Sequence, residues 1–292
     1  MGRPFFERVA IVGVGLIGGS LALDMKRLGL TGHVVGIGRG VENLKIAASR
    51  GIVDSWTTEL AEGVRGCGLV VVAVPVRSVA KVVEAMMPAL TEGTILTDVG
   101  SVKERIIEEV EPLLKEGVSF VPAHPIAGTE HSGAAAAFEG LFKDRKCIIT
   151  PTSRTPEDAL ETIKELWQAV GSEVVLMDAA LHDIVLAGVS HLPHVIAYSL
   201  VNTIATMEEK KGQKLLEFSA GGFRDFTRIA SSSPEMWADI CSMNKEAILD
   251  AIEEFKRTLD SIKESIAADD LDAIKGAFER AKKIRDAHIN DG

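Results

Sequence analysis

The first 177 residues alternate short apolar runs with segments of helical periodicity. The runs are rich in β-branched residues, and several are almost entirely apolar, which is typical of parallel strands covered on both faces. The expected strands are residues 8–12, 33–37, 69–74, 94–97, 119–121, 147–150 and 173–176. Helical patterns lie between most of them, at residues 18–28, 42–49, 78–86, 102–111 and 156–170. This alternation predicts βαβ units and an α/β fold with a doubly wound sheet.

After Met177 the strand signals stop and only helical patterns follow. Residues 179–209 form one long pattern, with a kink expected at Pro193 because proline removes an N–H and crowds the preceding turn. Further helices are expected at residues 215–218, 234–243, 244–267 and 271–288. The sequence therefore predicts two domains, residues 1–177 built on the sheet and residues 178–292 that are all-α.

The segment 184–207 is apolar enough to raise the question of a membrane span. It carries His191, His194 and Asn202, however, and each of these is costly in hydrocarbon. We expect instead a helix buried between protein layers, in a soluble and cytoplasmic protein that does not enter a membrane. A domain of about 115 residues has little interior for so apolar a helix, so we also expect a homodimer assembled through the α-domain.

The charge balance limits the partners that the chain can attract. Lys and Arg number 32 against 42 Asp and Glu, and the net charge of -10 disfavours nucleic acid and anionic membranes while permitting a local pocket for a small anion. Cys67, Cys147 and Cys241 lie far apart without paired spacing. They indicate free thiols in a reducing compartment and give no sign of a metal site.

A glycine-rich loop follows the first predicted strand. Gly13, Gly15 and Gly18 have a spacing in which the first permits a tight turn, the second a close approach to a pyrophosphate, and the third close packing of helix on strand. The backbone N–H groups that open the helix, at Leu16 and Ile17, offer a partial positive charge to phosphates. In its α/β context this motif predicts a dinucleotide-binding Rossmann domain and an NAD(P) cofactor.

The end of the second predicted strand bears on the choice between NAD and NADP. An NAD site usually places Asp or Glu there to hold the ribose 2′-hydroxyl, whereas this chain has Gly38 followed by Arg39. Arg39 can pair with a 2′-phosphate, which favours NADP. The alternative is a solvated arginine beside an NAD site that lacks its acid.

Two polar residues follow strands farther along the sheet. Pro125 holds His124 in an extended conformation, which displays the imidazole at the carboxyl end of a strand, where ligands of such sheets bind. Ser101 follows the strand 94–97 and can reach the same crevice, although a helix cap explains it equally well. His124 and Ser101 are therefore the candidate chemistry of the first domain.

Five motifs in order resemble the prephenate/arogenate dehydrogenase family of tyrosine biosynthesis. They are residues 13–20, 98–103, 124–130, 190–194 and 221–230. The resemblance covers nearly the whole chain and implies an oxidoreductase with an N-terminal Rossmann domain and a C-terminal dimerisation domain. The implied reaction is the oxidative decarboxylation of prephenate to 4-hydroxyphenylpyruvate with NAD(P)+. An arogenate dehydrogenase, or a cyclohexadienyl dehydrogenase of dual specificity, is the alternative.

The same resemblance implies roles for single residues. His124 matches the histidine that takes the proton of the substrate's ring hydroxyl, and Ser101 matches the serine that bonds the same hydroxyl and orients the imidazole. Arg228 matches the arginine that binds a substrate carboxylate, a role that suits its planar fork of donors. His194 matches a second histidine on the substrate side, although a hydrogen-bonded histidine in a buried helix explains it equally well.

Two acidic residues, one tryptophan and the remaining histidines complete the set of residues considered for the site. Glu130 and Asp225 match acidic residues near the site that could pair with Arg228 and gate it. Trp237 is expected to be a core or interface aromatic, and His191 to be structural. Surface or packing positions are expected for the others, His33, His131, His182 and His288.

Two other classes of protein stay open. A β-hydroxyacid dehydrogenase joins the same two kinds of domain but usually employs a lysine on the helical domain, whereas this chain offers His124 on the first domain. A nucleotide sensor without chemistry would need an element that binds DNA or a partner, and no basic recognition helix is visible.

Overall fold

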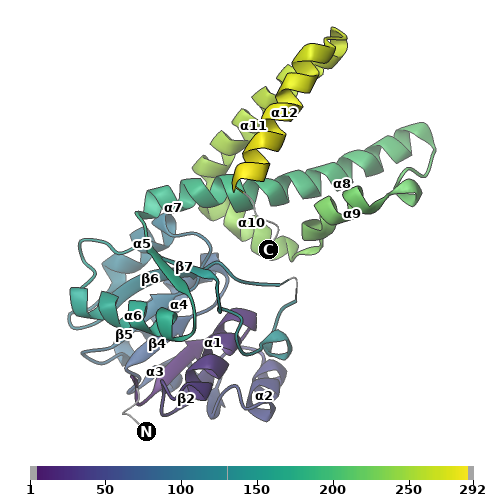
Figure 1. The fold of residues 1–292 in the computed structure, drawn as a ribbon. Helices are drawn as coiled ribbons and strands as arrows, with labels where there is room; N and C mark the ends of the chain where they lie inside the picture. Colours follow the sequence, from purple (N-terminus) through teal and green to yellow (C-terminus); the bar gives the residue numbers. More distant parts are fainter. Residues whose placement is uncertain (1–4, 130, 289–292) are drawn as a thin grey trace. The chain divides into compact units, whose positions relative to one another are not determined.

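The computed structural model describes residues 5–129 and 131–288. Its first part is built on an eight-stranded sheet in the order β3-β2-β1-β4-β5-β6-β7-β8 (Figure 1). Neighbouring strands are parallel from β3 to β6, β7 pairs antiparallel with β6, and β8 is parallel to β7. The doubly wound α/β fold that the sequence predicts is confirmed, and its last two strands are reversed.

The predicted strands and helices of this part are all present. The strands are β1 (Val9–Val12), β2 (Val34–Ile37), β3 (Ser55–Thr57), β4 (Leu69–Val72), β5 (Ile95–Asp98), β6 (Ser119–Pro125), β7 (Lys146–Ile149) and β8 (Glu173–Leu176). The helices are α1 (Leu16–Arg27), α2 (Val41–Ser49), α3 (Leu60–Val64), α4 (Val79–Met86), α5 (Glu104–Val110) and α6 (Glu157–Ala169). The sequence did not predict β3 and α3, because elements of three and five residues are too short to show a hydrophobic period.

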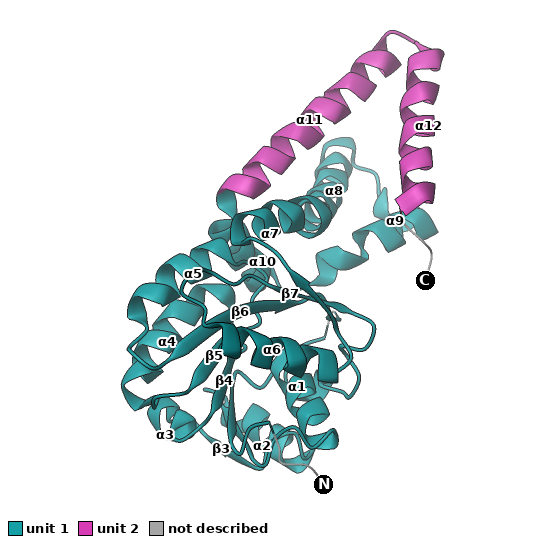
Figure 2. Cartoon of the chain, turned by 60° about the vertical axis from the view of Figure 1, so that its left-hand side comes forward, with its two compact units in different colours: residues 1–245 teal, residues 246–292 magenta. Residues whose placement is uncertain are grey.

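Helices cover both faces of the sheet (Figures 1 and 2). Val9 and Ile11 of β1 belong to an apolar cluster that includes residues of α1 and α6. Ala10 and Val12 point to the opposite face, since side chains alternate along a strand, and they are equally buried. Burial on both sides fixes the strands firmly, so the loops at their carboxyl ends are held in defined positions.

The helical segment after the sheet begins with a long continuous run. It consists of α7 (Ala179–Leu186), a π-helical turn (Ala187–His191) and α8 (Leu192–Lys211). The π turn ends two residues before Pro193, next to the expected kink, and its wider spacing accommodates a residue that has no N–H. Single π turns inside helices occur frequently at functional sites, and this one contains Ser190 and His191.

The chain divides into two compact units, residues 1–245 and residues 246–292 (Figure 2). The first unit ends with α9 (Gly221–Thr227), a 3-10 turn (Arg228–Ser231) and α10 (Pro234–Met243). Ser233 caps α10, because its hydroxyl accepts the N–H of Met236 at 3.3 Å. The second unit is a helical hairpin that holds nearly all of α11 (Lys245–Ala267) together with α12 (Leu271–His288).

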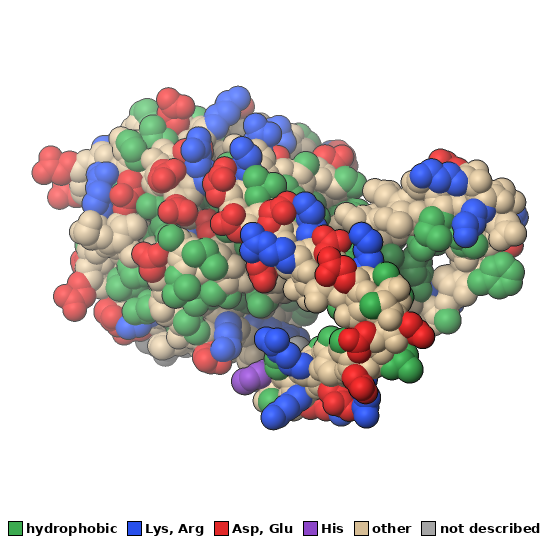
Figure 3. Space-filling view, turned by 90° about the horizontal axis from the view of Figure 1, so that it is seen from above, with side chains coloured by type: hydrophobic (Ala, Val, Ile, Leu, Met, Phe, Trp, Pro, Cys, Tyr) green, Lys and Arg blue, Asp and Glu red, His purple; other side chains and the backbone are tan. Residues whose placement is uncertain are grey.

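The helices of both units expose apolar side chains among mixed acidic and basic ones (Figure 3). Val189 is 72% exposed and Phe218 86% in the first unit, and Leu271 is 70% exposed in the second. Among the described residues, one helix, Ala179–Lys211, is long and apolar enough to cross a membrane, and only 22% of its most apolar window is buried. The described part of one chain therefore leaves most of this apolar window uncovered. Within the first unit, α9 and the neighbouring turns cover only part of its circumference.

Candidate active site

The turn from β1 into α1 has the geometry that the glycine pattern predicts. Gly13 has a φ of +97°, and a Cβ added there would lie 2.3 Å from the carbonyl oxygen of Ala73. A Cβ on Gly18 would lie 2.6 Å from the carbonyl oxygen of Gly13, whereas one on Gly15 would meet nothing within 4 Å. Gly13 and Gly18 are therefore required by the fold, and Gly15 leaves open space against the backbone.

The first turn of α1 points unpaired donors toward this space. The first hydrogen bond of the helix runs from the Gly19 N–H to the Gly15 carbonyl at 2.9 Å, so the N–H groups of Leu16, Ile17 and Gly18 have no partner within the helix. The loop opens into a cavity of about 660 Å³. Free N–H groups at a helix N-terminus beside such a cavity fit the pyrophosphate of a dinucleotide.

The cavity is lined by basic and neutral residues at the end of β2. Arg39 and Lys81 line it, and no carboxylate does so among the described residues. A Cβ on Gly38 would lie 3.6 Å from the Leu44 side chain, an ordinary contact, so packing does not require a glycine there. Arg39 is exposed and makes no hydrogen bond or ion pair within the described part of the chain. Its guanidinium is therefore free to meet an anion.

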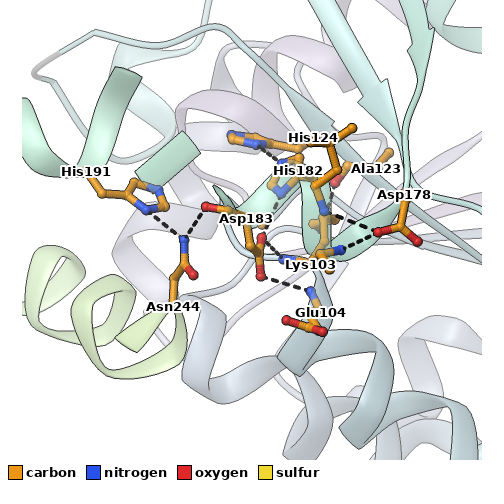
Figure 4. Close-up of polar contacts among 12 residues, drawn as sticks. Lys103, Glu104, Ala123, His124, Asp178, His182, Asp183, His191 and Asn244 are labelled. Carbon is orange, nitrogen blue, oxygen red and sulfur yellow. Dashed lines mark hydrogen bonds and ion pairs between the residues drawn. The ribbon is translucent and has the colours of Figure 1, made fainter. Parts of the chain in front are cut away.

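The imidazole of His124 belongs to a chain of three buried or partly buried groups (Figure 4). His124 lies on β6, and its Nδ1 is 2.9 Å from Nε2 of His182 on α7. Nδ1 of His182 is in turn 2.7 Å from Oδ1 of Asp183. His182 is 0% and Asp183 3% exposed, whereas His124 is partly exposed. We call these three residues the relay.

The position of His182 corrects the sequence-based expectation. His182 was expected to be a surface or packing residue, but it directly contacts the candidate catalytic histidine. The two residues lie 58 positions apart, and only the packing of α7 beside β6 brings them together. An adjacent His-Asp pair at the head of an otherwise apolar helix was the available signal, because such groups are costly to bury without partners.

Asp183 also fixes the loop that carries Ser101. Its Oδ1 accepts the backbone N–H of Lys103 at 2.9 Å, and its Oδ2 accepts that of Glu104 at 3.1 Å. The N-terminus of α5 is therefore capped by Asp183 from a distant segment, and no side chain of the residue before α5 caps it. Ser101 lies in the loop between β5 and α5 and is partly exposed, and within the described residues its hydroxyl forms no hydrogen bond that caps α5.

A buried ion pair supports the backbone next to His124. Lys103 pairs with Asp98, and its Nζ also donates to the carbonyl oxygen of Ala123 at 2.9 Å. Both charged side chains are 0% exposed. Burial lowers the pKa of Lys103, and the Asp98 carboxylate opposes that shift. Because Ala123 precedes His124 on β6, this ion pair helps to hold the imidazole in place.

His124 is neutral at pH 7. Burial lowers its pKa well below 6.5, and the neighbouring His182, Lys103 and His191 lower the pKa further. A neutral imidazole keeps one nitrogen lone pair, which can accept a proton. The arrangement therefore supplies a base at the carboxyl end of the parallel part of the sheet.

A second imidazole lies near a cation on the helical segment. Nδ1 of His194 is 2.9 Å from the carbonyl oxygen of Ser190, and its ring stacks on Trp237 with the centroids 3.7 Å apart. Burial lowers the pKa of His194, the Ser190 carbonyl opposes the shift, and the charge of Arg228 lowers it further. Trp237 is thus the wall against which His194 is held, and Arg228 lies close enough for its charge to lower the pKa of His194.

The structure describes only part of the expected gate, in which Glu130 and Asp225 pair with Arg228. Arg228 is exposed in its 3-10 turn, and Tyr198 ties the end of that turn to α8 by donating to the carbonyl oxygen of Ser232 at 2.7 Å. Asp225 is exposed on α9 and forms no ion pair with Arg228 within the described residues. Glu130 lies outside the described residues.

His191 has the structural surroundings that the sequence predicts. It is 1% exposed, and its Nδ1 lies 3.1 Å from the Asn244 amide nitrogen, which also donates to the carbonyl oxygen of Asp183 at 2.8 Å. Burial lowers the pKa of His191 to about 4. His191 is therefore neutral at pH 7 and joins α10's end to the relay.

A glycine-rich phosphate loop and a neutral imidazole at the carboxyl edge of one doubly wound sheet define a nicotinamide-dinucleotide-dependent dehydrogenase. Two family models match the chain: the nucleotide-binding domain of prephenate dehydrogenase over residues 21–176, and the dimerization domain of prephenate dehydrogenase over residues 178–280. The chain belongs to the prephenate dehydrogenase family.

Relatives of known name agree with this family. A cyclohexadienyl dehydrogenase of Zymomonas mobilis is 38% identical over 282 residues, 96% of this chain and 95% of that protein. The structure of a prephenate dehydrogenase from A. aeolicus, in complex with hydroxyphenyl propionate and NAD+, has a TM-score of 0.91 at 36% identity, over 97% of this chain and 98% of that one. Synechocystis arogenate dehydrogenase has a TM-score of 0.82 at 28% identity, over 97% and 100% of the two chains. The family, the fold class and the class of enzyme predicted from the sequence are confirmed.

Proposed function

We propose that this chain oxidises and decarboxylates prephenate to 4-hydroxyphenylpyruvate, with NADP+ preferred to NAD+ as hydride acceptor. The observation that carries the proposal is the neutral imidazole of His124, held on β6 at the same edge of the sheet as the glycine loop. Names of relatives support the substrate, since a structure at 36% identity is that of a prephenate dehydrogenase.

The proposed reaction uses one base, and it neither consumes nor releases a net proton. The bound nicotinamide supplies the hydride acceptor for the hydrogen at ring C4. His124 takes the proton of the C4 hydroxyl as that carbon becomes a carbonyl carbon, and Ser101 bonds the same oxygen. The carboxylate at C1 leaves as CO2, and its bonding electron pair enters the ring, which becomes aromatic. His124 then returns its proton to the phenolic oxygen.

Substrate binding is assigned to the helical segment. The charge of Arg228 reaches His194, and a guanidinium together with an imidazole suits a carboxylate of the substrate. This local positive charge explains how a chain of net charge -10 can bind a dianion. Glu130 and Asp225 are proposed to lie near Arg228 when the site is occupied.

The preference for NADP rests on the lining of the cofactor cavity. Gly38 offers no carboxylate to the ribose 2′-hydroxyl, and Arg39 and Lys81 are the charged residues that line the cavity within the described part of the chain. A carboxylate there would repel a 2′-phosphate, whereas a guanidinium forms charge-assisted bonds to it. The A. aeolicus relative at 36% identity binds NAD+, so the preference is proposed for this chain and not for the family.

Activity on arogenate is the second candidate function. Relatives at 38% and 28% identity are a cyclohexadienyl and an arogenate dehydrogenase. Prephenate and arogenate differ in a keto and an amino side chain, and both contain the ring on which His124 would act. A matrix of initial rates separates the candidates: prephenate and arogenate are each offered with NAD+ and NADP+, and absorbance of the reduced nicotinamide is followed. Turnover of several β-hydroxyacids and of neither cyclohexadienyl substrate would overturn the proposed function.

A homodimer in the cytoplasm completes the proposal. Residues 178–280 match a family model described as a dimerization domain, and the exposed apolar face of Ala179–Lys211 needs a cover that another copy could provide. The free cysteines Cys67, Cys147 and Cys241 suit a reducing compartment. Light scattering at micromolar concentration is expected to give twice the mass of 31.2 kDa. A mass of one chain would refute the dimer.

A further inference from the structure

We propose that His182 and Asp183 are positioning residues that fix the proton of His124 on Nδ1 and leave Nε2 as the base. The inference rests on the proposed role of His124 in the reaction. It follows from the direction in which each hydrogen bond of the relay must run, beginning at Asp183 (Figure 4).

The Asp183 carboxylate can only accept. Its two oxygens receive the backbone N–H groups of Lys103 at 2.9 Å and Glu104 at 3.1 Å, and these groups have no lone pair to offer in return. The contact of 2.7 Å between Oδ1 and His182 is therefore a bond in which Nδ1–H of His182 donates.

This assignment determines the next bond. A neutral His182 with its proton on Nδ1 has a lone pair on Nε2, and that nitrogen lies 2.9 Å from Nδ1 of His124. Nδ1 of His124 must then carry a proton and donate it to His182. The only lone pair left on the His124 ring is at Nε2, and His124 is the most exposed member of the relay.

The relay also prepares His124 for the charge that it gains. When Nε2 takes the substrate's hydroxyl proton, the ring becomes an imidazolium. The negative charge of the Asp183 carboxylate stabilises that positive charge through His182. Groups near His124 work in the opposite direction, since His182, Lys103 and His191 all disfavour its protonated form. Asp183 is therefore the group that stabilises the protonated form of His124 against these neighbours.

A single carboxylate thus serves two parts of the site. Asp183 orients His124 through His182, and it binds the N–H groups that directly follow the Ser101 loop. Its backbone carbonyl is held in turn by Asn244 at 2.8 Å. The helical segment therefore contributes to the base as well as to the substrate pocket.

The direct test is the tautomer of His124 in the full-length wild-type protein. Histidine is labelled with nitrogen-15, and the His124 signals are identified as those lost in His124→Gln. We expect a proton-bearing nitrogen at Nδ1 and a bare one at Nε2 between pH 7 and 8. A proton on Nε2 would overturn the relay. This readout needs no substrate, so it stands or fails separately from the proposed reaction.

Two substitutions of His182 test the role in turnover. Gln places an amide oxygen near the former Nε2, where it can accept from His124, whereas Phe fills the space and accepts nothing. We expect kcat to fall by about 10²-fold or more in His182→Phe and by less than about tenfold in His182→Gln. The KM for prephenate and the Kd for NADP+ should change less than about twofold in His182→Gln, since His182 touches neither ligand. Equal losses in both variants, or none in His182→Phe, would overturn the proposal.

Substitution of the carboxylate has a matched control on the same helix. Asp183→Asn removes the negative charge, and kcat should fall by about tenfold or more while the acid limb of the kcat profile moves to lower pH, because the His124 imidazolium loses the carboxylate that stabilises it. Asp178→Asn makes the same chemical change at the N-cap of α7, where Asp178 accepts the N–H groups of Ala180 and Leu181. Asn caps a helix as well as Asp does, so this control should leave kcat unchanged. An equal effect of both substitutions would mean that Asp183 acts only through stability.

Discussion

The dinucleotide site and the relay lie in the same compact unit but are assembled in different ways. The glycine loop is formed by residues within six positions of one another, between the end of β1 and the start of α1. The relay joins β6 to α7 across 58 positions, and Asp183 reaches a further 80 positions back to Lys103. A local motif is specified by its own backbone geometry, whereas a distributed one depends on the docking of segments that lie far apart in the chain.

The two regions also differ in what a single substitution should change. The glycine loop contains no group that takes part in proton transfer, so its substitutions should affect dinucleotide affinity and stability. The relay contains no group expected to touch the dinucleotide's phosphates, so its substitutions should affect turnover. Five predictions test this separation, beginning with the largest expected effect.

Removal of the base should give the largest loss. His124→Asn is expected to reduce kcat by about 10²–10⁴-fold, the usual contribution of a positioned acid–base group, and to leave the Kd for NADP+ unchanged. Stopped-flow or steady-state rates and a fluorescence titration measure the two quantities. His33→Asn is the control, because His33 bonds Ser55 between β2 and β3, away from the relay. Turnover near the wild-type level would remove His124 from the mechanism.

Removal of the arginine that is proposed to bind the substrate carboxylate should affect binding more than chemistry. Arg228→Ala is expected to weaken prephenate binding by about 2–5 kcal/mol, with a smaller change in kcat, because a carboxylate loses its charged partner. Arg224→Ala removes a neighbouring arginine on α9 and should leave the KM for prephenate almost unchanged. An unchanged KM in Arg228→Ala would show that Arg228 faces elsewhere.

Substitution in the glycine loop should lower the free energy of unfolding, because the loop has little room for a side chain at Gly13. Gly13→Ala combines a φ of +97° with a Cβ only 2.3 Å from the Ala73 carbonyl oxygen, and we expect a loss of about 2–4 kcal/mol in the free energy of unfolding. Gly29→Ala isolates the backbone contribution, since Gly29 has a φ of +68° and open space around it, and should cost about 1 kcal/mol. Urea unfolding measures both, and equal losses would mean that the close contact is relieved cheaply.

The cofactor preference should reverse with two substitutions. The native enzyme is expected to prefer NADP+ by about tenfold in kcat/KM, which corresponds to 1.4 kcal/mol. Gly38→Asp with Arg39→Ile should prefer NAD+, and the space at residue 38 tolerates a side chain because Leu44 lies 3.6 Å from the added Cβ. Parallel saturation curves decide the matter. A preference for NAD+ in the native enzyme would mean that Arg39 is only a surface charge.

The pH profile should show the smallest change. His124 acts as a neutral base, and its pKa lies well below 6.5, so lowering the pH from 8 to 6.5 should leave kcat/KM nearly constant. Activity should fall only when the pH passes below the lowered pKa and the imidazole becomes protonated. A rate profile in buffers of constant ionic strength measures this, and loss of half the activity already at pH 6.5 would contradict the burial effect.

Residues with short-range constraints were predictable from the sequence. The glycine spacing, the strand that precedes it and the helix that follows it could be identified because each glycine answers a requirement of its immediate neighbours. His124 could be placed at a strand end because Pro125 restricts it locally. Ser101 could be placed in the same loop as the start of α5, but not distinguished from a cap, because the cap comes from Asp183.

Two features of the molecule depend on packing that local patterns do not record. The segment 184–207 was expected to be buried between protein layers, and a single chain leaves most of the apolar window of Ala179–Lys211 uncovered, because hydropathy records how apolar a helix is and not which surface covers it. His182 was expected at a surface or packing position, and its contact with His124 could not be predicted because the two residues lie 58 positions apart in the chain.

Local sequence patterns were sufficient to predict the doubly wound sheet, the dinucleotide loop and the residue types that the chemistry requires. Hydrophobic period and turn chemistry act over a few residues, so they can be interpreted along the chain. The tertiary structure alone decided that His182 meets His124 and that Asp183 caps α5. A hydrogen bond depends on the distance and direction between two atoms, and for residues 58 or 80 positions apart these quantities exist only once the segments have packed together.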